Sequence, residues 1–221
     1  EATTGCHSRT HPMISTIELM AVISGAVFGV LAARRKGLDL VGVVSVAMMT
    51  AFGGGSLRDL LLDRHPLFWI EHSRYPVIVF TVACGLSLLP RIPERAVRLL
   101  DLTDALGLGL FSIVGTQLAL DQGVPPFVAV LLGVITGSFG GVIADIVCNE
   151  VPGLFRPDTP LYATCAFAGG WGLIGLQQLA VSESVAFPAA TFVVVAMRLA
   201  ALKFRIVLRS TDNPHGQTQN P

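Results

Sequence analysis

Seven long apolar segments, separated by short polar links, follow one another along the chain. They cover about residues 14–33, 39–62, 75–90, 102–120, 125–148, 160–180 and 186–207. A helix needs about 20 mostly apolar residues to cross the hydrocarbon core of a bilayer. The buried core of a soluble all-α domain produces one or two such runs, not seven in 221 residues. The pattern therefore predicts an all-α polytopic membrane protein with seven transmembrane helices.

The composition supports a chain that faces lipid over most of its surface. Hydrophobic residues make up 52% of the sequence and charged residues only 14%, whereas soluble domains carry nearer a quarter charged residues. The formal net charge is zero, so it indicates neither an acidic nor a basic partner. We expect the lipid bilayer to be the main partner and expect no nucleic acid to bind.

No motif of a catalytic or cofactor-binding site accompanies the apolar segments. The four cysteines have no CxxC spacing, and three of them lie in apolar segments, where cysteine usually packs as a small residue. His65 and His72 have no third ligand at metal spacing. The sequence contains no phosphate-binding loop, dinucleotide fingerprint or catalytic triad pattern. We therefore expect neither an enzyme nor a cofactor.

Both ends of the chain are polar. Residues 1–13 lack the apolar core of a signal peptide, and residues 208–221 are rich in turn-forming residues. We expect both segments to be disordered. With the N-terminus outside, eleven Lys and Arg residues fall inside and three outside, with Arg58 left out of the count. Because inside loops carry the excess of basic residues, the sequence predicts that the N-terminus lies outside the membrane and the C-terminus inside.

The sequence partly matches itself when it is shifted by 86 residues. The matched pairs include Glu18 with Asp104, Gly29 with Gly115, Thr50 with Thr136, Gly54 with Gly140, Gly55 with Gly141 and Asp59 with Asp145. We interpret the match as two three-helix repeats at about 14–90 and 102–180, joined by an inside link at 91–101 and followed by a lone helix at 186–207.

A three-helix repeat must enter the membrane from the opposite side the second time. The two halves then form an inverted pair, and such pairs commonly build a transport site near the bilayer midplane from helices interrupted at matching positions. The matching interruptions here are GGGS at 53–56 and GSFGG at 137–141. We expect the site where these two motifs meet.

The glycines predict a break in each of the two helices. Glycine costs about 1 kcal/mol relative to alanine inside a helix, and broken backbone in a membrane requires protein or a water-filled cavity around it. Freed carbonyls and nearby hydroxyls would suit a partly hydrated monovalent cation. The candidate lining residues are Thr50, Gly53, Gly54, Gly55, Ser56, Thr136, Gly137, Ser138, Gly140 and Gly141. The alternative is that the glycines only allow close helix packing.

Charged residues beside the glycines are candidates for controlling the path. Arg58 and Asp59 follow the first motif, whereas the second keeps Asp145 but has Ala144 in the arginine position. Buried charges in membranes usually face the bundle interior and pair, so Arg58 could bridge to Asp59, Asp145 or Asp104. The alternatives are a purely structural salt bridge, or a position close enough to the membrane interface for the side chain to snorkel. Glu18 and Asp104 lie near helix ends, where a boundary charge is the simpler interpretation.

The ordered series of motifs resembles a known family. TAFGGGSLRD, LTDALGLGLFSIVGTQLAL and GVITGSFGGVIADIV resemble the bacterial members of the trimeric intracellular cation (TRIC) channels, which are also described as glycine transporter domain proteins, over about residues 15 to 205. The resemblance implies a homotrimer with a potassium-permeable pore in each protomer beside kinked helices two and five. Ala144 and Phe139 depart from the family pattern, which has arginine and glycine there.

The main functional hypothesis, which follows the resemblance, is a passive channel for K⁺ or Na⁺ in a bacterial-type inner membrane, with the C-terminus in the cytoplasm. In this hypothesis Arg58, Asp59 and Asp145 set the field and the gating. The alternative is a secondary transporter of a small zwitterion such as glycine, with helix ends binding the carboxylate and an aspartate the ammonium. A structural membrane module without transport is a third interpretation.

Overall fold

The structure is a computed structural model, and it describes residues 12–89, 96–156 and 159–207. The predicted disorder of residues 1–13 and 208–221 lies outside the described residues, except that Pro12 and Met13 belong to the first helix. Most of the predicted link at 91–101 also lies outside them, but helix begins at Ala96, within the range that we assigned to the link.

The described residues fold into α-helices with short connections. The bounds are α1 Pro12–Arg35, α2 Leu40–Leu61, α3 Phe68–Glu71, α4 Arg74–Ser87, α5 Ala96–Asp121, α6 Pro126–Val147, the 3₁₀ turn η1 Gly153–Phe155, α7 Ala163–Gln178 and α8 Glu183–Phe204. The prediction of an all-α membrane protein is confirmed. Five helices (α1, α2, α5, α6 and α8) are long and apolar enough to span a bilayer. The helices in the remaining two predicted segments are shorter: α4 has 14 residues and α7 has 16.

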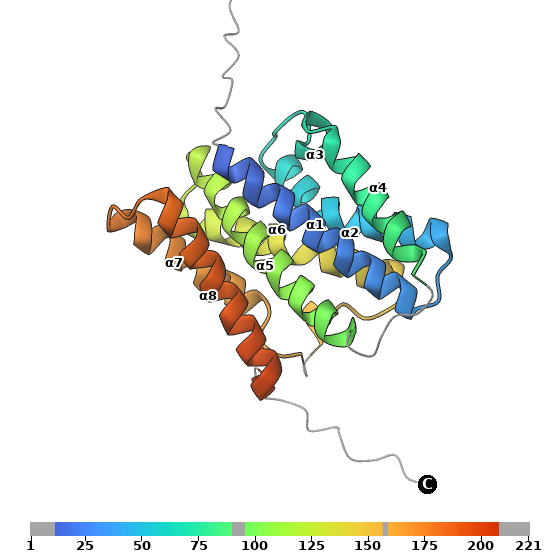
Figure 1. Cartoon of the computed structure of the whole chain (residues 1–221). Helices are drawn as coiled ribbons and strands as arrows, with labels where there is room; N and C mark the ends of the chain where they lie inside the picture. The colour runs from blue at the N-terminus through green and yellow to red at the C-terminus, as the bar shows by residue number, and fades with distance from the viewer. Residues whose placement is uncertain (1–11, 90–95, 157–158, 208–221) are drawn as a thin grey trace, which may run out of the picture.

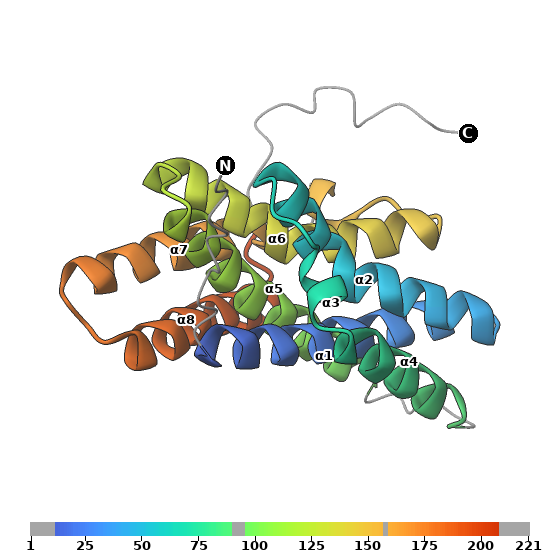
Figure 2. The same cartoon turned by 90° about the horizontal axis from the view of Figure 1, so that it is seen from above.

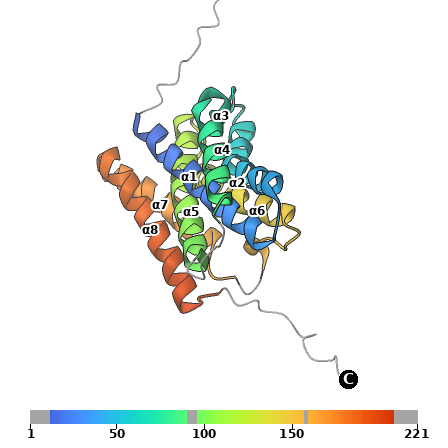
Figure 3. The same ribbon diagram turned by 45° about the vertical axis from the view of Figure 1, so that its right-hand side comes forward.

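Four long helices form the centre of the molecule. α1 packs on α2 and α5, and α6 packs on the same two helices (Figure 1). α4 covers α1 and α2 on one flank, whereas α7 and α8 cover α5 on the other, as Figure 2 and Figure 3 show. The arrangement places the two glycine motifs, on α2 and α6, against each other at the centre.

Positions 86 residues apart adopt matching backbone conformations. Gly37 and Gly123 end α1 and α5 with φ of 71° and 77°, and in each case the next residue's N–H donates to the carbonyl five residues back. This is the Schellman helix end, in which glycine takes the left-handed conformation without a steric cost. Asp63 and Asn149, after α2 and α6, have φ of 50° and 56°. The correspondence read from the sequence therefore extends to the turns.

Small residues dominate the contacts between the central helices. Ala21, Ala26, Ala47 and Ala51 are all fully buried in the cluster that joins α1 to α2. Without water to drive apolar surfaces together, membrane helices associate through close van der Waals contact, which small side chains allow. Large apolar side chains such as Phe192 and Leu179 stay exposed, as expected for a surface that meets lipid.

Candidate functional site

The glycine motifs of α2 and α6 meet in a reciprocal backbone contact. A Cβ atom on Gly54 would overlap the carbonyl oxygen of Thr136, and a Cβ on Gly140 would overlap the carbonyl oxygen of Thr50. The two glycines are 86 positions apart, and so are the two threonines. The same contact therefore occurs twice with the helices exchanged, and the two halves contribute equally to the crossing. Neither helix could approach this closely with any side chain larger than hydrogen at these two positions.

The predicted helix breaks are not present. α2 and α6 continue as α-helix through 53–56 and 137–141, so their glycines free no carbonyls by unwinding. The close packing of the two helices offsets the poor helix propensity of glycine, and tertiary packing commonly overrides propensity in this way. Of the two interpretations of the motifs, the geometry favours close packing.

The hydroxyl groups near the crossing bond mainly to their own helices. Thr50 donates to the carbonyl oxygen of Val46 at 2.7 Å, and Thr136 donates to that of Leu132 at 2.6 Å. A hydroxyl oxygen that donates its proton keeps its lone pairs, so both threonines still offer acceptor oxygens. Ser56 faces α3 instead, where its hydroxyl accepts the indole N–H of Trp69 at 2.9 Å.

Three adjoining cavities lead from one end of the central helices toward the crossing. The rim cavity, about 390 Å³, is lined by residues that include Arg35, Lys36 and Glu150. It shares Phe28 and Asp145 with the middle cavity of about 160 Å³. The middle cavity in turn adjoins the neck cavity, about 20 Å³, which reaches Thr50 and Thr136 and shares the following residues with it: Phe28, Asp104, Gly141 and Tyr162.

The volumes decrease toward the crossing. A cavity needs about 10–15 Å³ to hold one water molecule, so the neck cavity of about 20 Å³ accommodates about one. The predicted residues that line the neck or middle cavity are Thr50, Asp104, Thr136, Gly137, Ser138, Gly140, Gly141 and Asp145. The remaining predicted residues are not among the lining of these three cavities: Glu18, Gly53, Gly54, Gly55, Ser56, Arg58 and Asp59.

Arg58 lies in a buried cluster at the other end of the central helices. Its side chain is 0% exposed and contacts Asp59 at 2.7 Å and Glu18 at 3.3 Å. The guanidinium carbon lies 5.3 Å from the centroid of the Phe68 ring, and Gly55 leaves the space that this ring fills. We call Glu18, Arg58, Asp59 and Phe68 the Arg58 cluster. Of the bridges considered for Arg58, the one to Asp59 is present, whereas Asp104 contacts Arg198 and Asp145 accepts a backbone N–H. The interpretation of Glu18 and Asp104 as boundary charges is wrong, because both side chains are largely buried and each contacts an arginine.

Asp59 and Asp145 have the same structural role in the two halves. Asp59 accepts the backbone N–H of Phe68 at 2.8 Å, at the start of α3. Asp145 accepts the backbone N–H of Gly153 at 2.8 Å, at the start of η1. Each carboxylate therefore fixes the segment that follows its own helix. Asp145 also lines the rim and middle cavities, whereas Asp59 is fully buried.

A second buried arginine, which the sequence analysis used only to orient the chain, lies beside the middle cavity. Arg198 of α8 contacts Asp104 of α5 at 3.3 Å. The hydroxyl of Tyr162 donates to the same carboxylate at 2.8 Å, and the guanidinium carbon lies 4.5 Å from the centroid of the tyrosine ring. We call Asp104, Tyr162 and Arg198 the Arg198 cluster. A charge within the predicted span 186–207 was the available signal, since such charges are costly unless paired.

The rim cavity carries an exposed ion triad. Glu150, in the loop after α6, pairs with Lys36, which directly follows α1, and with Arg156, the latter at 2.8 Å. The hydrogen bond from Lys36 lowers the pKa of Glu150 below its ordinary value of 4.5, and the charges of Lys36 and Arg156 add to this effect. The triad joins the first half of the chain to the second. Within the described residues, no group of three His, Cys, Asp or Glu side chains could hold a metal ion.

Comparisons with known proteins agree on one family. The glycine transporter family model matches the chain twice, at residues 15–91 and 101–178. A UPF0126 membrane protein of Vibrio cholerae is 35% identical over 89% of this chain and 82% of its own length. The UPF0126 inner membrane protein YadS of Escherichia coli is 31% identical over 89% of this chain and 95% of its own.

Solved structures show the same fold. The TRIC trimeric intracellular cation channel orthologue of Rhodobacter sphaeroides superposes with a TM-score of 0.82 at 31% identity, over 88% of this chain and 99% of the channel. A second TRIC cation channel gives a TM-score of 0.80 at 30% identity, over 91% of this chain and 98% of that one. The twofold family match, the curated relatives and the shared fold lead to one conclusion: this chain is a multi-pass membrane protein of the glycine transporter (UPF0126) family, with the fold of the TRIC channels.

Proposed function

We propose that this protein is a passive channel for monovalent cations, permeable to K⁺, with a path inside each protomer of a homotrimer. The observation that carries the proposal is the series of three adjoining cavities of about 390, 160 and 20 Å³, which narrows toward the meeting point of the two glycine motifs. The likeness to TRIC cation channels supports the same function.

The charges and oxygens along the cavities suit a cation. Asp104 and Asp145 face the middle cavity, and Thr50 and Thr136 reach the neck. Hydroxyl and carbonyl oxygens replace part of the hydration shell of an alkali cation in channels. In the proposed path, K⁺ loses water at the neck, and the threonine oxygens at the crossing of α2 and α6 are its ligands there.

The proposed gate lies on the side of the neck where the Arg58 cluster closes the bundle. The neck accommodates about one water molecule, so a hydrated ion requires a wider state. Arg58 holds α2 to α1 through Glu18, while Asp59 holds α2 to α3 through Phe68. Opening then requires these helices to separate or rotate. The proposal also includes an inverted orientation of the two halves in the membrane and a cytoplasmic C-terminus. With this orientation the rim cavity would open to the cytoplasm.

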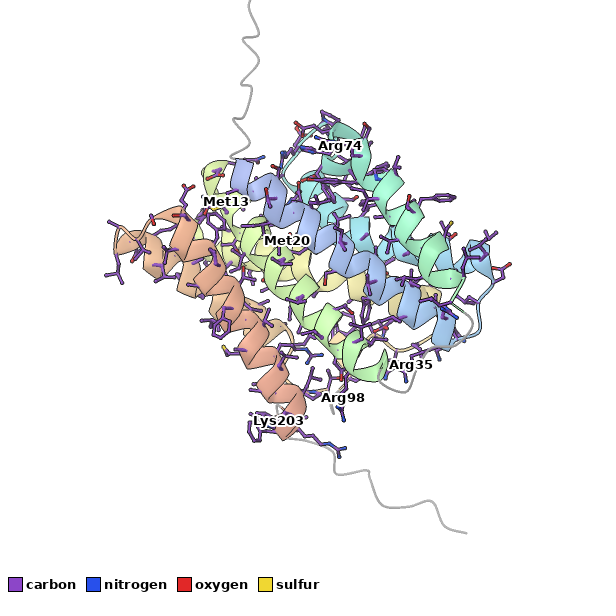
Figure 4. All side chains as sticks on the ribbon, viewed as in Figure 1. Met13, Met20, Arg35, Arg74, Arg98 and Lys203 are labelled. Atoms are coloured by element: carbon purple, nitrogen blue, oxygen red, sulfur yellow. The ribbon has the colours of Figure 1, made fainter. Side chains whose placement is uncertain are left out.

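The basic residues agree with this orientation. Arg35, Arg98 and Lys203 lie toward the end of the molecule where α5 begins, whereas Arg74 and Met13 lie toward the opposite end (Figure 4). An excess of basic residues at one end favours that end as the cytoplasmic one.

Purified protein in planar bilayers or K⁺-loaded vesicles tests the channel. We expect a K⁺ current that grows with the K⁺ concentration and does not saturate at low K⁺. The reversal potential should follow the K⁺ gradient. Absence of K⁺ current or flux at both voltage polarities would reject the proposal.

The second candidate is a transporter of a small zwitterion such as glycine. The middle cavity has both a carboxylate, from Asp104, and a guanidinium, from Arg198, in its lining, and these could bind the ammonium and carboxylate groups. The family description points the same way. Saturable glycine uptake that unlabelled glycine competes for, with no K⁺ current, would favour the transporter over the channel.

A further inference from the structure

The two buried arginine clusters occupy corresponding places in the two halves of the chain. Glu18 and Asp104, which are 86 positions apart, each lie near the start of the first helix of a half, α1 or α5. Each carboxylate contacts an arginine at 3.3 Å. Because α1 and α5 run in opposite directions (Figure 1), the two clusters lie at opposite ends of the central helices.

The arginines themselves do not correspond. Arg58 comes from α2, within the first half, and the matching position on α6 is Ala144, which is fully buried. Arg198 comes from α8, outside both halves. We infer that Arg198 replaces the arginine that position 144 lacks, and that it sets the charge at the entrance to the neck cavity. The second part of this inference rests on the proposed channel.

The surroundings of Arg198 fix its position. Its side chain is 7% exposed and that of Asp104 is 13% exposed. One terminal nitrogen donates to the carbonyl oxygens of Pro160 and Leu161 at 2.8 and 3.1 Å, and the other contacts Asp104. Stacking on the Tyr162 ring adds a cation–π contact. The guanidinium is therefore held by α5 and by the segment before α7, with little freedom to turn away.

The position of the cluster determines what its charge does. Asp104 and Tyr162 line both the middle and the neck cavity, and Arg198 lines the middle cavity. A cation that moves from the rim to the neck passes the Asp104 carboxylate. Arg198 neutralises this carboxylate, which is the charged group in the described lining of the neck cavity. Asp101 and Asp145 also line the middle cavity, so the pairing lowers the negative charge at the entrance without removing it. In a narrow, weakly screened passage, one unit charge strongly changes the local concentration of a permeant ion.

Two substitutions should therefore act in opposite directions. Arg198→Gln leaves the Asp104 carboxylate without its cation, so K⁺ conductance should rise by about threefold or more. Asp104→Asn leaves the guanidinium alone, and K⁺ conductance should fall by a similar factor. A purely structural cluster predicts losses in both variants. Lys203→Gln, which removes an exposed charge from the same helix, is the matched control and should conduct as the wild type does.

A rescue experiment tests the replacement itself. Arg198→Ala should lower the melting temperature in detergent, because it leaves the buried Asp104 carboxylate without its cation. Adding Ala144→Arg should bring the melting temperature most of the way back to that of the wild type. Ala144→Arg alone should destabilise the protein, since its site is already filled. This measurement needs no ion flux. If the wild type carries no K⁺, the proposed function fails while the melting temperatures still decide whether Arg198 replaces the arginine.

The outcomes separate clearly. Conductance that rises in Arg198→Gln and falls in Asp104→Asn, with rescue by Ala144→Arg, supports the inference. A conductance that rises in both variants, falls in both, or changes in neither overturns the assignment of the entrance charge. A double variant that melts no higher than Arg198→Ala overturns the replacement. If Arg198→Gln does not fold, the conductances of Asp104→Asn and Arg198→Lys are compared instead. Arg198→Lys keeps the positive charge and should conduct nearly as the wild type does, whereas Asp104→Asn should conduct less. An unchanged conductance in Asp104→Asn counts against the inference.

Discussion

Gly54 of α2 lies against the carbonyl oxygen of Thr136 on α6 so closely that a Cβ atom would overlap it. The same contact recurs between Gly140 and Thr50 with the helices exchanged. Backbone therefore meets backbone at the centre of the protein, and the threonines that face the neck cavity are positioned by the glycines of the opposite half.

Alanine at Gly54 or Gly140 should force the two helices apart. Overpacking of a tightly packed interior costs about 1–3 kcal/mol, so each variant should melt at a lower temperature, and the pair together lower still. Thermal unfolding followed by size-exclusion chromatography in detergent measures this. Gly172→Ala is the matched control, because a Cβ there meets nothing within 4 Å, and its helix propensity should improve by about 1 kcal/mol. Equal melting of Gly54→Ala and Gly172→Ala would contradict the close contact.

The sequence predicted the fold because the strongest constraint on a membrane protein is the length of its apolar segments. The shift of 86 residues also led us to expect that the two glycine motifs meet, and Gly54 and Gly140 do lie against Thr136 and Thr50. It did not predict that α2 and α6 stay continuous. Intrinsic propensity disfavours glycine in helices, and only the neighbouring helix, which propensity ignores, explains why three glycines fit there.

The second buried arginine shows a different limit. A charge within the predicted span 186–207 was visible, but the pairing of Arg198 with Asp104 depends on how α8 rotates about its axis and where it packs on α5. The apolar pattern of α8 does not fix that rotation, because apolar residues such as Phe187 and Phe192 occur on both its buried and its exposed faces. Arg198 is one of the eleven basic residues that the sequence analysis counted on the inside, whereas the structure buries its side chain between α8 and α5.

Arg58→Met should destabilise the protein strongly. The substitution leaves Glu18 and Asp59 buried without their common cation, and removing one partner from a buried ion pair costs about 3–5 kcal/mol. Glu18→Gln should cost less, because Asp59 still contacts Arg58 at 2.7 Å. Thermal melts of the two variants test the order. Arg74→Met, at an exposed position on α4, is the control and should melt as the wild type does; a melting temperature of Arg58→Met that matches it would refute the role of the cluster.

Asp145→Ala should loosen the segment after α6. The variant loses the hydrogen bond from the backbone N–H of Gly153, and hydrogen bonds to charged groups contribute about 1.5–3 kcal/mol. Asp145→Asn keeps an acceptor oxygen and should lose less. Hydrogen exchange of the amides around Gly153 reports the local effect, with faster exchange expected in Asp145→Ala alone. Asp59→Ala should lower the melting temperature more than either Asp145 variant, because it also removes a contact of Arg58. Similar exchange in Asp145→Ala and the wild type would contradict the role of Asp145 as a cap for η1.

The ion triad at the rim should make part of the stability depend on pH. Because the pKa of Glu150 is lower in the folded protein than its ordinary 4.5, the folded state binds fewer protons, and the contribution is present above about pH 4.5 and lost as pH falls through the lower folded value. Glu150→Gln removes it at every pH. The melting temperatures of wild type and Glu150→Gln should therefore differ at pH 6–7 and converge on acidification. High salt should narrow the difference, because exposed ion pairs are screened. A difference that stays constant from pH 7 to pH 3 would show that Glu150 acts through something other than its charge.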